Sequence, residues 1–223
     1  MKKRLRRRRS LAEPPEGAKS QRILIEVSVF YLVFFASGLI PRPYPEVMSF
    51  SVSRELLRLF GYTLPGTALL WLLSRPVPKP GFSDGIACLL SLPCLIGFGF
   101  GVSAVAAWAG FPPANPPPET PAALPAWTIL AADCLGTGYL EEGFFRFRLI
   151  RRLAEAGLSR TKSLALSALL FGACHIYEGP GGVFNAILAG LTLSLISTRL
   201  HAPHGIAWSH GCYNFFAYLL SIL

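Results

Sequence analysis

Charged residues are scarce in this sequence. They account for 15% of the 223 residues, whereas an average soluble domain carries roughly 25%. Apolar residues account for 52%, and the mean hydropathy is +0.46. This balance excludes an intrinsically disordered chain and an ordinary cytosolic enzyme. It is the composition of a membrane protein.

The sequence also lacks a disulfide framework. All five cysteines lie inside or beside apolar segments, and an odd number leaves at least one unpaired. This excludes a disulfide-stapled miniprotein, and we expect the thiols to pack as small buried apolar groups. They are Cys88, Cys94, Cys134, Cys174 and Cys212.

Positive charge is concentrated at the amino terminus. Residues 1–22 hold nine of the 21 Lys and Arg, and an apolar segment follows at once. A basic run in this position favours a cytoplasmic tail held by anionic membrane lipid over a nucleic-acid-binding arm. We therefore predict lipid as a partner and no nucleic-acid partner.

Apolar segments separated by proline-rich loops predict the fold. A helix needs about 20 residues to cross a hydrocarbon core of ~30 Å, and seven segments approach that length. We predict an all-α, polytopic membrane helix bundle of about seven transmembrane helices (six to eight). The predicted spans are Ile23–Ile40, Leu56–Leu73, Gly85–Ala109, Trp127–Phe147, Ser163–Ile176, Val183–Leu200 and Ile206–Leu223.

The charges in the loops predict how this bundle is oriented in the membrane. With the amino terminus inside, 18 of the 21 Lys and Arg fall on the cytoplasmic side, and only Arg42, Arg54 and Arg58 fall outside. This agrees with the positive-inside rule, and the short loops favour a bacterial inner membrane. We divide the chain into a cytoplasmic tail at 1–22, amino-terminal helices at 23–126 and a helical core at 127–223.

Ionisable residues inside membrane spans are costly, so each one is a functional candidate. Glu26 lies near the start of its span, where we expect a structural role at the interface, while Asp133 has no obvious local partner and its role stays open. Glu141 and Glu142 are adjacent. Glu142 lies four residues before Arg146, a spacing that predicts an ion pair on a helix. Glu141 then faces another direction and is free to serve a site.

Two later spans each carry an inward-facing polar group. His175 ends the segment that starts at Phe171, and His210 and Asn214 are four residues apart, on one face of the last helix. A single histidine of this kind is usually a packing residue, but polar groups on three successive spans predict a polar cavity. We treat His201 and His204 as ordinary loop residues.

The motifs EExxxR, FxxxH and HxxxN occur in this order on successive apolar segments, over residues 127–216. Together they resemble the CAAX-protease and bacteriocin-processing (CPBP, or Abi) family of intramembrane endopeptidases. The chain departs from the family at Phe147, where members commonly have glycine.

The resemblance implies a catalytic core in the four carboxy-terminal helices. In that core Glu141 would act as the base that activates water, and His175 would assist it. His210 and Asn214 would stabilise the oxyanion, while Glu142, Arg146 and Phe171 would support the site. The substrate would be a membrane-anchored or membrane-associated protein.

The resemblance leaves the use of a metal to be decided, because the family is often described as metalloproteases. Zinc could take Glu141, His175 and His210 with water as a fourth ligand. No HExxH is present, however, and we expect glutamate catalysis without a metal or other cofactor. No GxSxG segment stands out, and we expect Cys174 not to face the adjacent His175 if both lie on one helix.

Two alternatives belong to other functional classes. One is a catalytically silent relative acting as a membrane scaffold or immunity protein. The other is an ion-coupled transporter, although no repeat of the kind common in transporters is evident. Bacteriocin leaders, prenylated tails and sorting segments all remain open as substrates.

Overall fold

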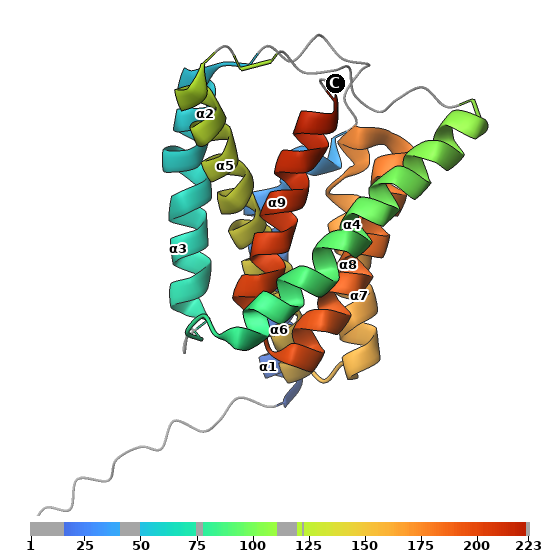
Figure 1. The fold of residues 1–223 in the computed structure, drawn as a ribbon. Coiled ribbons are helices and arrows are strands. Elements are labelled where there is room, and N and C mark those ends of the chain that lie inside the picture. Colours follow the sequence, from blue (N-terminus) through green and yellow to red (C-terminus); the bar gives the residue numbers. More distant parts are fainter. Residues whose placement is uncertain (1–15, 41–49, 75–77, 111–119, 122, 222–223) are drawn as a thin grey trace, which may run out of the picture.

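The computed structural model describes residues 16–40, 50–74, 78–110, 120–121 and 123–221, and these residues form helices without any strand. Seven helical rods pack into one bundle (Figure 1), which confirms the predicted all-α fold. The α-helices are α1 (Glu16–Phe35), α2 (Val52–Arg58), α3 (Leu64–Leu73), α4 (Phe82–Trp108), α5 (Leu124–Glu142), α6 (Ile150–Glu155), α7 (Arg160–Ala173), α8 (Gly179–Leu200) and α9 (Pro203–Ser221).

Four helical segments are long and apolar enough to cross a membrane. They include 3-10 turns at Ala36–Leu39 and Ile176–Glu178, which extend α1 and α8. The protein is therefore an integral membrane protein, while the number of crossings stays a prediction. The four segments are Gly17–Leu39, Val52–Leu73, Phe82–Trp108 and Ile176–Leu200.

Two rods contain π-helical segments, in which each turn takes up an extra residue. Leu59–Thr63 joins α2 to α3 directly before Pro65, whose missing N–H and ring disturb the regular ladder. Gly143–Leu149 joins α5 to α6, so this helix runs on to Glu155 rather than ending near Phe147 as we predicted. Such segments are frequent at functional sites.

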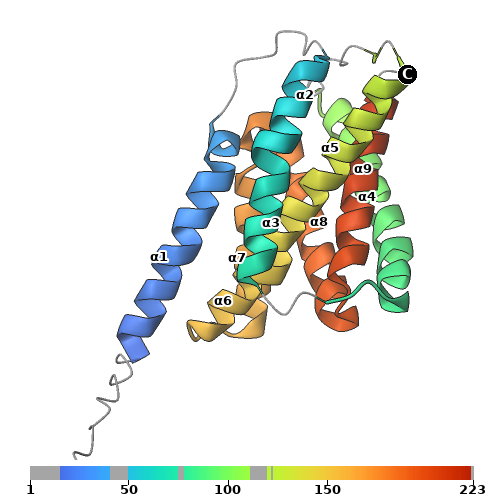
Figure 2. The same ribbon diagram turned by 90° about the vertical axis from the view of Figure 1, so that its left-hand side faces the viewer.

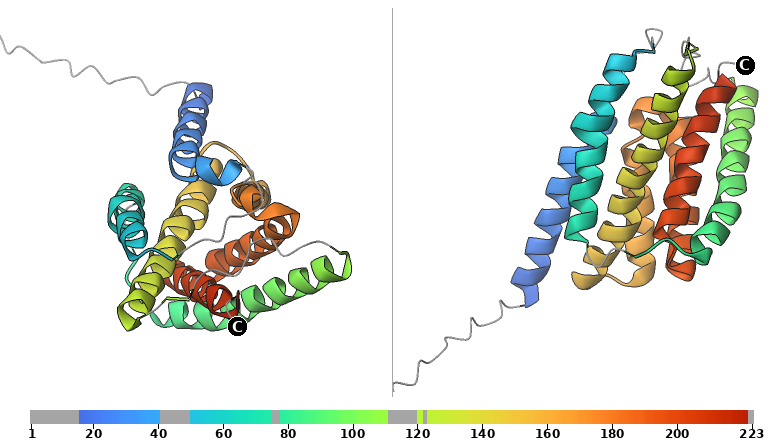
Figure 3. Two further views of the ribbon diagram at one scale, coloured as in Figure 1. Left: turned by 90° about the horizontal axis from the view of Figure 1, so that it is seen from above. Right: turned by 60° about the vertical axis from the view of Figure 1, so that its left-hand side comes forward.

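Helices α5 and α9 lie against each other at the centre of the bundle (Figure 3). A Cβ at Gly138 would lie 2.6 Å from the carbonyl oxygen of Ala207, and one at Gly211 would lie 2.7 Å from Cα of Leu135. Only glycine allows this spacing, because close backbone approach in membrane bundles requires small residues. Helices α4 and α8 pack beside α9, and α7 packs on α8.

Helix α1 packs across the outside of α6 and α7 (Figure 2). The Tyr31 hydroxyl donates to the carbonyl of Leu170 (2.9 Å), and the ring of Phe35 lies 4.8 Å from that of Phe145. Glu26 accepts hydrogen bonds from both Arg148 and Arg152. The structural role expected for Glu26 is therefore to tie α1 to the rod formed by α5 and α6.

Residues 1–15 of the predicted basic tail lie outside the described residues, and α1 already begins at Glu16. The end of the bundle at which α1 begins also contains α6, and we refer to it as the tail end. Helices α2 and α5 begin at the opposite end (Figure 2).

Candidate active site

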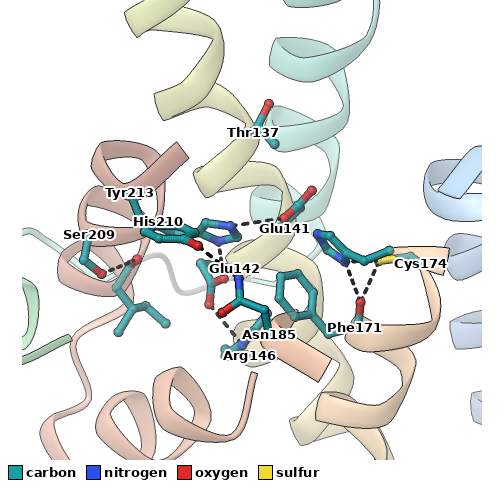
Figure 4. A network of polar contacts seen from close by, with 12 residues as sticks. Thr137, Glu141, Glu142, Arg146, Phe171, Cys174, Asn185, Ser209, His210 and Tyr213 are labelled. Atoms are coloured by element: carbon teal, nitrogen blue, oxygen red, sulfur yellow. Dashed lines mark hydrogen bonds and ion pairs between the residues drawn. The ribbon is translucent and has the colours of Figure 1, made fainter. Parts of the chain in front are cut away.

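The two adjacent glutamates have different surroundings at the junction of α5 and the π-helical segment. The Glu142 side chain is 1% exposed and lies 3.1 Å from Nε of Arg146, so the predicted ion pair is present. Glu141 points elsewhere, and its side chain is 15% exposed (Figure 4). One carboxylate is thus fixed by a cation, and the other retains access to the site.

His210 connects α9 to both glutamates. Its Nδ1 lies 2.7 Å from Oε1 of Glu142, and its Nε2 lies 3.5 Å from Oε2 of Glu141 (Figure 4). The first distance is that of a strong charge-assisted hydrogen bond, and the second exceeds the usual range. Glu142 therefore orients the ring, and the ring directs Nε2 toward Glu141.

Arg146 is buried between α5, α7 and α8. Its guanidinium carbon lies 4.2 Å from the centre of the Phe171 ring, a cation–π geometry. Gly190 on α8 lies beside the guanidinium, and a Cβ there would lie 3.1 Å from Cα of Ala168, so this glycine allows α7 and α8 to approach closely around Arg146. The structure thus gives Phe171 a definite role, which is to cover the arginine that pairs with Glu142.

His175 occupies a different position from the one predicted. Helix α7 ends at Ala173, so His175 lies in the turn that follows and not on the helix. Its Nδ1 lies 2.7 Å from the carbonyl oxygen of Phe171, and its ring lies 4.7 Å from the Phe171 ring. The ring of His210 contacts the same phenylalanine at 5.7 Å. Phe171 separates the two histidines, which do not bond to each other among the described residues.

The expectation for Cys174 was wrong. Because the helix ends before these residues, Sγ of Cys174 lies 3.5 Å from Nδ1 of His175. Both groups also lie within bonding distance of the Phe171 carbonyl (Figure 4). The described cysteines are free thiols; Cys174 is buried, but Cys94 and Cys212 are exposed, contrary to the expected burial.

Asn214 shares a helix with His210 and is half-buried, but it makes no hydrogen bond within the described part of the chain. A second amide lies nearby and escaped the sequence analysis. Nδ2 of Asn185, on α8, donates to the Tyr213 hydroxyl (3.0 Å), and its buried Oδ1 has no partner among the described residues. A lone amide within an apolar span was the available signal.

Aromatic side chains close the tail end of the site. Trp71 on α3 stacks on Phe147 (5.2 Å) and on His204 (5.1 Å). Nε2 of His204 lies 2.9 Å from the carbonyl of Pro78, and Nδ1 lies 3.2 Å from the Tyr139 hydroxyl. His204 is therefore a buried packing residue, in the first turn of α9 and not in a loop as we expected. Phe147, where the chain departs from the family pattern, is part of this aromatic cover.

The residues considered for zinc do not fit one ion. Both ring nitrogens of His210 face the two glutamates, while Nδ1 of His175 faces the Phe171 carbonyl. No three His, Cys, Asp or Glu side chains converge as metal ligands within the described residues. The polar cluster that does form is a carboxylate–imidazole–carboxylate arrangement anchored by arginine.

Comparisons with known proteins agree with the motifs. Residues 123–216 match a family model described as type II CAAX prenyl endopeptidase Rce1-like. This match confirms the resemblance to the CAAX-protease and bacteriocin-processing family, and it indicates a peptidase domain. The searches of curated proteins and of solved structures found no match.

Proposed function

Since residues 123–216 form a Rce1-like domain, we propose that this protein is an intramembrane endopeptidase in which Glu141 activates water. Its substrate is a membrane-anchored or membrane-associated protein. The observation that carries the proposal is the unequal surroundings of Glu141 and Glu142, which are adjacent in sequence. Glu142 is held by two partners, whereas Glu141 makes one ion-pair contact, at 3.5 Å, within the part of the chain that the structure describes.

Glu141 is the carboxylate suited to take a proton. A general base must reach the proton it removes, directly or through one water, and must not already be committed to a cation. In the proposed reaction the water oxygen bonds to the peptide carbonyl carbon as Glu141 takes a water proton. The C–N bond then breaks, and the proton passes to the leaving nitrogen.

His210 and Asn214 supply donors for the oxyanion in this proposal. Glu142 fixes the His210 ring through Nδ1 at 2.7 Å, so Nε2 is preoriented at the site. Preoriented donors stabilise a developing negative oxygen because they need no reorganisation during the reaction. Asn214 has an uncommitted amide one turn further along α9, and His175 assists from beyond α7. No step passes through a metal.

We further propose that the tail end faces the cytoplasm. Basic residues at the end of the rod that contains α6, and at the start of α7, gather there, and α1 begins at the same end (Figure 2). This distribution supports the positive-inside orientation. The basic residues concerned are Arg148, Arg151, Arg152, Arg160 and Lys162.

The test compares membrane-protein termini by mass spectrometry in cells that express the wild type or Glu141→Gln. Glutamine keeps the shape but cannot take the proton, so we expect cleavage to fall by about 10²- to 10⁴-fold. Glu155→Gln is the control, because Glu155 lies on α6 with its side chain 39% exposed. Processing that persists in Glu141→Gln at equal levels of folded protein would reject Glu141 as the base. Termini that are the same in cells with the wild type and in cells without the protein would reject the peptidase function and return the scaffold and transporter alternatives.

A further inference from the structure

One face of α5 carries a polar residue at every fourth position. Asp133, Thr137 and Glu141 follow this spacing, which places them in a line along the helix. Thr137 lies one turn above Glu141, and both point to the same side of α5 (Figure 4). The line leads from the proposed base toward the end of the bundle opposite the tail.

Arg58 on α2 joins the line at its outer end. Its Nη2 lies 3.3 Å from Oδ2 of Asp133 and 2.9 Å from Oγ1 of Thr137. The Arg58 side chain is 49% exposed, whereas that of Asp133 is 3% exposed. The polar line is thus continuous from an exposed guanidinium to the residue directly above Glu141.

One carboxylate oxygen of Asp133 lacks a well-formed hydrogen bond. Its Oδ1 is buried and receives no geometrically well-formed hydrogen bond among the described residues, although the Thr63 and Glu55 side chains lie close enough to interact with the carboxylate. Buried polar atoms are almost always bonded to protein or to ordered water. Because the neighbouring Arg58 already contacts Oδ2, a water molecule next to Oδ1 is the simplest way to satisfy this carboxylate.

Glu141 lies far from both ends of its helix. It is near the middle of the continuous rod Leu124–Glu155, so roughly 20 to 25 Å of helix separates it from either end. Between Glu141 and the tail end the bundle is filled by aromatic side chains, since Phe144 and Phe145 are fully buried and Trp71 is 8% exposed. Hydrolysis at Glu141 needs a supply of water that the aromatic cover does not offer.

We propose that water reaches Glu141 along this polar line, which Arg58, Asp133 and Thr137 form between α2 and α5. The inference rests on the proposed role of Glu141, because it identifies the source of the hydrolytic water. Polar residues inside membrane spans typically mark such aqueous or ionic paths. A hollow of about 420 Å³ lined by Ile176, Val183 and Phe184 is apolar and does not attract water.

The test is thiol labelling of the full-length protein in vesicles with a charged, membrane-impermeant methanethiosulfonate. Thr137→Cys places a thiol in the line, and Leu135→Cys is the matched control. Leu135 lies two residues away, hence on the opposite side of α5, beside Gly211 of α9, and it is 40% exposed. Modification is quantified for each cysteine by mass spectrometry, so the native cysteines can remain.

We expect the thiol at 137 to react at least about tenfold faster than the thiol at 135, because the reactive thiolate forms only where water solvates it. Modification at 137 should also block cleavage, whereas Leu135→Cys should keep its activity. Equal labelling at the two positions overturns the water path. Labelling does not require catalysis, so a reactive thiol at 137 alongside an active Glu141→Gln variant would refute the proposed base and leave the path standing.

Discussion

The amino-terminal helices α1–α4 and the carboxy-terminal helices α5–α9 differ in what their sequences reveal. All three motifs and the whole family match lie in the second region, within residues 123–216. The first region contains no recognisable motif, yet its side chains hold the second in place. Glu26 pairs with Arg148, and Trp71 stacks on Phe147. The concentration of motifs in a region therefore does not make it structurally independent.

Separating the two regions should have the largest effect. If the chain is divided between α4 and α5, the carboxy-terminal piece loses Trp71, the α1 contacts and the α4 surface that packs on α8 and α9. We expect this piece alone not to accumulate as folded protein, and co-expression of both pieces to restore it. Size-exclusion chromatography of the purified pieces would show this. A stable, monodisperse carboxy-terminal piece would contradict the conclusion that the amino-terminal helices hold the carboxy-terminal helices in place.

Within the second region, Glu142→Ala should be severely destabilising. It leaves the buried Arg146 and His210 without their shared carboxylate, and breaking a buried pair by removing one partner costs about 3–5 kcal/mol. Unfolding of the purified protein measures the loss, with Glu155→Ala as an exposed control. A loss no larger than that of the control would show that Glu142 does not anchor the cluster.

Arg148→Ala tests the link between the regions, and we expect a smaller loss of stability than for Glu142→Ala. Arg148 is buried and bonds to Glu26, but Arg152 still reaches the same carboxylate. Hydrogen bonds to charged groups contribute about 1.5–3 kcal/mol, so we expect a loss within or below that range, together with slower cleavage. Arg151→Ala is the matched control because its side chain is 41% exposed. Equal stability of the two variants would show that the Arg148–Glu26 bond does not help to hold α1.

Tyr31→Phe should have the smallest effect. It removes only the hydrogen bond to the Leu170 carbonyl and keeps the ring against Phe144. Hydrogen bonds between membrane helices contribute about 0.6 kcal/mol on average. The same unfolding assay should therefore show a small loss with unchanged cleavage. A loss as large as that of Arg148→Ala would place the main link between the regions at Tyr31.

The sequence predicted those features that depend on local spacing. Proline-rich loops and apolar runs located the helical rods, although α1 starts at Glu16 and the fourth rod ends at Glu155, both beyond the predicted ends. The four-residue spacing predicted the Glu142–Arg146 pair, now observed at 3.1 Å. The open question about Asp133 is answered by Arg58, which lies 75 positions earlier in the chain. No spacing rule relates two residues so far apart, because only the packing of α2 on α5 brings them together.

Helix ends and cross-bundle pairs escaped prediction for the same reason. The turn that carries His175 follows a helix end that no proline marks, and Ile176 beyond it is still apolar. The Asn185–Tyr213 hydrogen bond joins α8 to α9. The amide of Asn185 stands out in its apolar span, but no spacing rule identifies Tyr213 as its partner. The roles of Glu141, His175, His210 and Asn214 in catalysis stay predictions.

The π-helical segment Gly143–Leu149 determines the directions in which side chains before and after it face along the long rod. Each residue of a regular helix advances it by about 100°, so one additional residue in a turn rotates everything beyond it. Upstream of the segment the rod presents Glu142 to α9, and downstream it presents Arg152 to Glu26 on α1. A chain shortened by one residue here could keep one of these alignments but not both. The extra residue thus allows a single helix to serve two partners.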